Sequence, residues 1–126
     1  MKIKFTIIIF FLFPLLVNAQ NFQIDKPALP IDSLKKVLAL LRDSAKVDCL
    51  NELTRSYSEA RQWDSAMVMV KHAYNDASAI NYIKGLGDAD LQYGVIYSFP
   101  NTNIPEAEKY YREAIFWHEK YDMIMD

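Results

Sequence analysis

Residues 50–73 read LNELTRSYSEARQWDSAMVMVKHA, and this stretch decides the fold. Its first part places a stripe of mostly large residues on one helical face: Leu50, Leu53, Thr54 and Tyr57. After a short break over residues 60–63, the second part presents smaller residues at helical spacing: Ala66, Val70 and Ala73. Large side chains on one helix set against small ones on the next allow two antiparallel helices to pack closely. The stretch therefore predicts a helical hairpin that stacks on other hairpins.

The amino terminus has the pattern of an export signal. Lys2 and Lys4 precede an apolar run over residues 5–17, which is the length of the apolar region of a signal peptide. Residues 17–19 read VNA, so we predict a signal peptide over residues 1–19 that is cut between Ala19 and Gln20. The exported protein would then be periplasmic or extracellular. A membrane anchor is the alternative, but the run is short for a membrane span and contains a proline.

The composition restricts the partners and the redox chemistry. The chain has 126 residues and a net charge of -2, which becomes -4 when residues 1–19 are removed. There is no basic stripe, so nucleic acid is a poor candidate partner. Cys49 is the only cysteine, so no intrachain disulfide is possible. Its place within a helical pattern favours partial burial over a reactive thiol.

After a linker over residues 20–31, the chain predicts five helices in series and no strand. We expect these helices over residues 32–42, 45–60, 64–80, 83–98 and 105–121. Short polar side chains at the first three starts predict N-caps: Asp32 or Ser33, Asp43 or Ser44, and Asp64 or Ser65. Residues 99–103 predict a loop, and Pro105 suits the first turn of the last helix.

The hairpin pattern occurs twice. Ala66-x3-Val70-x2-Ala73 returns 41 residues later as Ala107-x3-Tyr111-x2-Ala114. Leu50-x2-Leu53-Thr54-x2-Tyr57 returns 40 residues later as Asp90-x2-Tyr93-Gly94-x2-Tyr97. We therefore divide residues 32–126 into a leading helix (32–42), a first repeat (45–80) and a second repeat (83–121). The residues expected to pack the repeats are Leu50, Leu53, Tyr57, Ala66, Val70, Ala73, Tyr93, Gly94, Tyr97, Ala107, Tyr111 and Ala114.

These two patterns resemble the tetratricopeptide repeat, whose helices read W-x2-L-G-x2-Y and A-x3-F-x2-A. The resemblance implies an all-α fold, in which about five helices form antiparallel hairpins stacked as a short right-handed solenoid. Thr54 replaces the glycine of the first copy, and Asp90 replaces the first large apolar residue of the second. Asp90 predicts either a weak packing contact or a polar contact. The period of 40–41 residues exceeds the usual 34 and implies longer helices.

The order of the segments resembles a more particular group. A signal peptide, DSLKKVL over residues 32–38 and KGLGDADLQYGVIY over residues 84–97 look like the exported repeat arrays of bacterial sensor histidine kinases. The resemblance implies a non-catalytic module that binds a protein or peptide at the extracytoplasmic front of a signalling protein. A free-standing periplasmic repeat protein that acts in assembly is the alternative. Because residues 121–126 are mainly apolar, we expect either a longer array or self-association through that face.

No chemistry of an enzyme is recognisable in the sequence. His72 and His118 lack ligand partners at zinc-site spacing, and no nucleophile or phosphate-loop motif is present. We predict no catalytic activity, no cofactor and no metal site. The aromatic residues could form a stacking platform for a sugar or peptide, but at helical spacing they favour packing.

The remaining candidate site is the concave surface formed by the first helix of each repeat. In the tetratricopeptide family this surface binds peptides. The residues off the packing stripe are Asp48, Asn51, Arg55, Ser58, Glu59, Asp88, Leu91, Val95 and Ser98. Asn51 and Arg55 lie one turn apart and could hold a peptide by charge-assisted hydrogen bonds. The alternative is that they simply face solvent.

Overall fold

The computed structural model describes residues 29–100 and 102–126, and in this part the chain forms five helices and no strand. The expectation of an all-α fold is confirmed. The helices are α2 (Ile31–Leu38), α3 (Asp43–Glu59), α4 (Trp63–Ala79), α5 (Ile83–Ser98) and α6 (Ile104–Met125). The predicted signal peptide and residues 20–28 of the predicted linker lie outside the described residues. No helix in the described ranges is long and apolar enough to cross a membrane.

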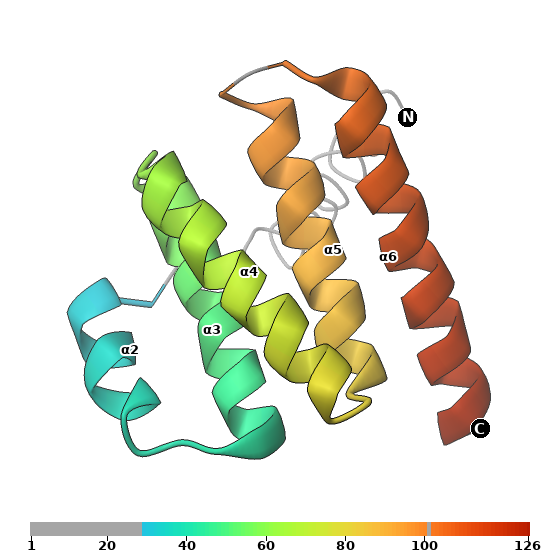
Figure 1. Ribbon diagram of the computed structural model, residues 1–126, viewed down its shortest axis with the longest axis horizontal. Coiled ribbons are helices and arrows are strands. Elements are labelled where there is room, and N and C mark those ends of the chain that lie inside the picture. Colours follow the sequence, from blue (N-terminus) through green and yellow to red (C-terminus); the bar gives the residue numbers. More distant parts are fainter. Residues whose placement is uncertain (1–28, 101) are drawn as a thin grey trace, which may run out of the picture.

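The helices follow one another across the molecule in chain order, from α2 at one edge to α6 at the other (Figure 1). α3 and α4 form one antiparallel hairpin, and α5 and α6 form a second. α5 links the second hairpin to the first, because it pairs with α6 and also packs against α3 and α4. The short helix α2 packs on α3.

The core lies mainly between α3, α4 and α5. Its larger cluster includes every predicted packing residue of the first repeat, namely Leu50, Leu53, Tyr57, Ala66, Val70 and Ala73. Val47, Ala77 and Leu86 form a smaller cluster next to it, against which Trp117 of α6 packs. In the second repeat Gly94, Ala107 and Ala114 are buried, whereas the three tyrosines predicted to pack it are half-buried: Tyr93, Tyr97 and Tyr111. The packing residues of the second hairpin are thus less completely buried than those of the first.

Helix boundaries differ from the sequence prediction at both ends of the domain. Ile31 belongs to α2 rather than to the linker, and α2 ends at Leu38 instead of residue 42. Backbone bonds from Leu40 N–H to the Val37 carbonyl and from Leu41 N–H to the Leu38 carbonyl tighten the turn that follows. This turn brings Leu41 against the core. α6 runs to Met125, four residues further than predicted.

The predicted N-caps of the first three helices are wrong. The N-cap residues are Pro30, Arg42 and Gln62, and none makes a side-chain cap hydrogen bond. Asp32, Asp43 and Asp64 instead lie in the first turns, where a carboxylate favours the positive end of the helix dipole. Only α6 has a side-chain cap in the described structure, because Asn103 accepts a hydrogen bond from the Glu106 N–H. Pro105 stands in the first turn of α6, as predicted.

α3 and α4 both end in the same reversal of the backbone. Arg61 (φ 57°) and Asn81 (φ 53°) adopt the left-handed conformation just past each helix. The N–H of Gln62 bonds to the Tyr57 carbonyl, and that of Tyr82 bonds to the Ala77 carbonyl, each at 2.8 Å. These six-to-one bonds are the Schellman motif, which satisfies the last carbonyls of a helix. The backbone itself therefore sets the turns that follow α3 and α4.

Candidate functional site

A trough runs along the surface between α3 and α5. It consists of two adjoining cavities of about 560 and 340 Å³ that share Leu91 and Gln92. Eight of the nine residues predicted on the concave surface line it: Asp48, Asn51, Arg55, Ser58, Glu59, Asp88, Leu91 and Val95. The ninth, Ser98, does not line it; its hydroxyl donates to the Gly94 carbonyl at 2.8 Å and lies 3.2 Å from the Tyr111 hydroxyl.

One end of the trough is apolar. Leu91 and Val95 of α5 face Trp63, and Phe99 at the end of α5 is 71% exposed. The rings of Trp63 and Phe99 are nearly parallel, at an interplanar angle of 5° and a centroid distance of 6.4 Å. An apolar side chain of a partner would remove this exposed aromatic surface from water.

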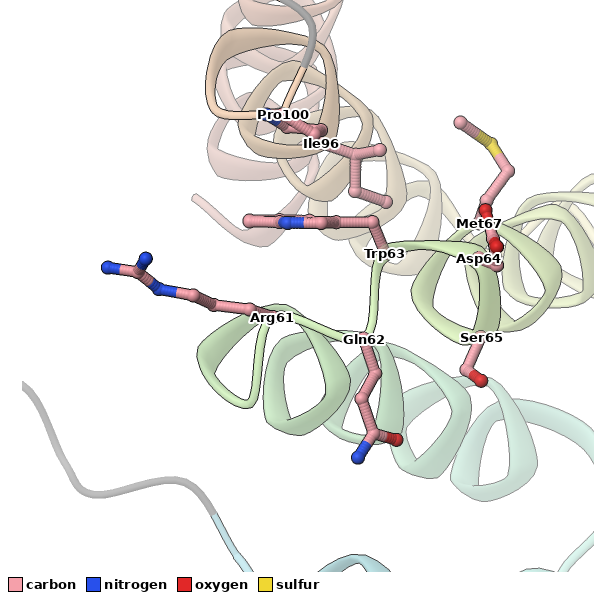
Figure 2. Close-up of a pocket in the computed structure, with 8 residues that line it drawn as sticks. All are labelled: Arg61, Gln62, Trp63, Asp64, Ser65, Met67, Ile96 and Pro100. Carbon is pink, nitrogen blue, oxygen red and sulfur yellow. The ribbon is translucent and has the colours of Figure 1, made fainter.

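A third cavity, of about 540 Å³, continues from this end. Figure 2 shows that the Trp63 ring lies beneath Ile96 and Pro100, and that Arg61 extends in the same direction as that ring. Trp63 and Arg61 line both this cavity and the trough. The indole therefore separates two adjoining hollows at the tip of the first hairpin.

The other end of the trough is polar and its charges are paired. Lys84 lies 2.8 Å from an Asp88 oxygen and 4.0 Å from Asp48. The Tyr82 hydroxyl donates to Asp48 at 2.8 Å, and burial together with this bond raises the pKa of Tyr82 to about 12. The second Asp88 oxygen lies 3.2 Å from Nε2 of His118 on α6. Asp88 thus connects the trough to the last helix.

Asn51 and Arg55, predicted to hold a peptide together, make separate contacts within the protein. The Asn51 side chain is 7% exposed, and its amide Nδ2 donates to the Gly85 carbonyl at 3.2 Å. This bond ties α3 to the first turn of α5. The Arg55 guanidinium lies 3.3 Å from Glu52 and 3.5 Å from Glu59 on its own helix. Asn51 therefore holds the walls of the trough together, and the charge of Arg55 is largely neutralised.

Sequence reasoning missed six residues that line the trough: Glu52, Arg61, Trp63, Lys84, Gln92 and Phe99. The sequence places Phe99 in a loop. In the structure it is the C-cap residue of α5, and the end of this helix leaves its side chain exposed. Lys84 and Gln92 stand on the helix that carries Asp88 and Leu91, so a complete helical projection of α5 would have found them.

The remaining reactive residues do not form a site within residues 29–100 and 102–126. Cys49 is buried, its thiol donates to the Leu34 carbonyl at 3.5 Å, and burial raises its pKa. In this part of the chain no three His, Cys, Asp or Glu side chains gather as a metal site would require.

Comparisons of the chain with protein-family models, with curated proteins and with solved structures found no match.

Proposed function

We propose that this protein is a non-catalytic module that binds a peptide segment of a partner protein in the trough between α3 and α5. The observation that carries the proposal is the trough itself. Eight residues chosen for their place on two repeated helices line one continuous depression. Its apolar end exposes aromatic surface, while its polar end presents charged groups in fixed positions. An apolar anchor beside ordered polar groups is the usual composition of a peptide groove.

We further propose that the helices form a short tetratricopeptide-like solenoid. Two observations support this arrangement. The paired alanines of the two repeats are all buried: Ala66, Ala73, Ala107 and Ala114. α5 packs against both helices of the preceding hairpin, as the first helix of a following repeat would. In this proposal the protein is exported through its amino-terminal signal peptide and acts as the sensory or scaffolding part of a signalling protein.

Selection from a phage-displayed library of random short peptides tests peptide binding. The peptides enriched on the wild-type protein should share an apolar residue, and Leu91→Asp should weaken their binding at least about tenfold because it places a charge on the apolar wall. Ile115→Asp is the matched control, because Ile115 is also an exposed apolar residue of a helix but does not line the trough. Absence of enriched peptides, or equal binding by the Leu91 variant, would contradict the proposal.

A second candidate function is assembly through α6. Its outer surface exposes several large apolar side chains, namely Ile115, Phe116, Met123, Ile124 and Met125. Such a surface favours association with a second copy or a neighbouring repeat. Sedimentation at several concentrations should then show an association that Phe116→Asp abolishes. A monomer at all concentrations would reject self-association.

A further inference from the structure

A carboxyl group is enclosed where α4, α5 and α6 meet. Asp90 on α5 is 0% exposed, and neither of its oxygens has a hydrogen-bond partner among the described residues. It stands where the first repeat carries Leu50 in the apolar core. The sequence predicts either a weak packing contact or a polar contact here; the carboxyl is fully buried, and the Trp117 indole of α6 is the polar donor that acts on it. A buried charge without a partner is strongly unfavourable, so the protonated form is favoured in the folded protein.

The groups around Asp90 come from each helix that meets there. Tyr74 belongs to α4, Tyr93 to α5 and Tyr110 to α6, and the carboxyl acts electrostatically on all three. Their rings touch in series, with centroids 6.2 and 4.7 Å apart.

The charged residues of α6 act on Asp90 in opposite directions. Burial is the main cause that raises its pKa from 3.8 to about 7, and the carboxylate of Glu113 adds to it. The Trp117 indole and the Lys109 ammonium lower the pKa, although the indole completes no hydrogen bond to the carboxyl. Ionisation would therefore place a second negative charge close to Glu113, inside the contact between α5 and α6.

We propose that Asp90 makes the docking of α6 on α5 depend on pH: ionisation of its carboxyl weakens the contact, and protonation restores it. α6 is the helix that responds because its main contact among the described helices is with α5, whereas α5 is also held by α3 and α4. Asp88 pairs with His118 of α6 and also lines the trough. Release of α6 therefore alters one wall of the site proposed above.

The direction of the effect follows from the ionisation equilibrium. The folded protein binds the Asp90 proton more tightly than the unfolded chain does. Docking is thus strongest below the ordinary pKa of an aspartate and weakens as the pH rises through about 7. The His118 imidazole, 3.2 Å from Asp88, is charged only if it is protonated, so it is a second ionisable group at the same helix contact. The experiment must separate these two groups.

Amide hydrogen exchange of the full chain at pH 5.5 and 8.5, corrected for the intrinsic exchange rates, separates them. We expect the protection of α6 relative to α3 to fall on the order of tenfold at the higher pH. Asp90→Asn should remove most of this fall, and Asp90→Leu provides the same test if the asparagine variant does not fold. His118→Gln should retain it. An equal loss of protection in α3 and α6, or an unchanged pH dependence in both Asp90 variants, would overturn the proposal.

Discussion

The two hairpins fill equivalent positions with different residues. The first carries Thr54 and Val70, and the second carries Gly94 and Tyr111 in their places. Thr54 is completely buried, and its hydroxyl donates to the Leu50 carbonyl at 2.8 Å. In the second hairpin the Tyr111 ring lies directly over Gly94, so that a Cβ there would overlap with it.

A larger residue on one helix is thus matched by a smaller one on the other. The repeat retains the combined volume between its helices rather than the individual residues. Leu50 and Asp90 do not follow this rule, because a buried carboxyl with no hydrogen-bond partner among the described residues replaces an apolar side chain of similar size. At this position the first hairpin therefore has an apolar core residue, whereas the second has a carboxyl group that can change its charge.

The largest expected effect concerns the difference in burial between the two hairpins. Tyr57 is 7% exposed within the main core, whereas the equivalent Tyr97 is half-buried. Tyr57→Ala should lower the free energy of unfolding by about 3–5 kcal/mol, the range for a buried aromatic residue, and Tyr97→Ala by roughly half as much. Urea denaturation measures both. Equal losses would show that the hairpins contribute equally to the core.

The packing of the Tyr111 ring on Gly94 predicts a smaller loss of stability, which depends on the residue at position 111. Gly94→Ala should destabilise the protein by about 1–3 kcal/mol, because the new methyl group collides with the Tyr111 ring. Tyr111→Val reproduces the smaller residue of the first hairpin. The double variant should recover at least about 1 kcal/mol relative to the sum of the single changes, in a double-mutant cycle measured by urea denaturation. Simple additivity would refute the volume exchange.

The smallest effect compares the turns that follow α3 and α4. Arg61 and Asn81 both have positive φ, but asparagine tolerates this conformation better than arginine does. Arg61→Gly should stabilise the protein by ~0.5–1 kcal/mol. Asn81→Gly should stabilise it less, by only about a few tenths of a kcal/mol. Thermal unfolding detects the difference. If the asparagine variant gained more, relief of backbone strain would not be the cause.

Much of the fold follows from periodicity in the sequence. The helices and their pairing were predictable because the apolar stripes recur at helical spacing and the pattern repeats after 40–41 residues. The trough was predictable in outline for the same reason: a residue's place on a helix determines which side it faces. The N-caps were wrong because α2, α3 and α4 begin one or two residues earlier than predicted, which places Asp32, Asp43 and Asp64 inside the first turns.

The sequence by itself determined the helices, their order and the face on which each residue lies, because these depend on local spacing along the chain. Only the tertiary structure decided what those residues do. Asn51 is tied to Gly85, Phe99 is exposed beside Trp63, and Asp90 is enclosed with no hydrogen-bond partner in the part of the chain that the structure describes. The physical reason is that burial and pairing depend on neighbours far apart in the chain, and periodicity carries no information about those neighbours.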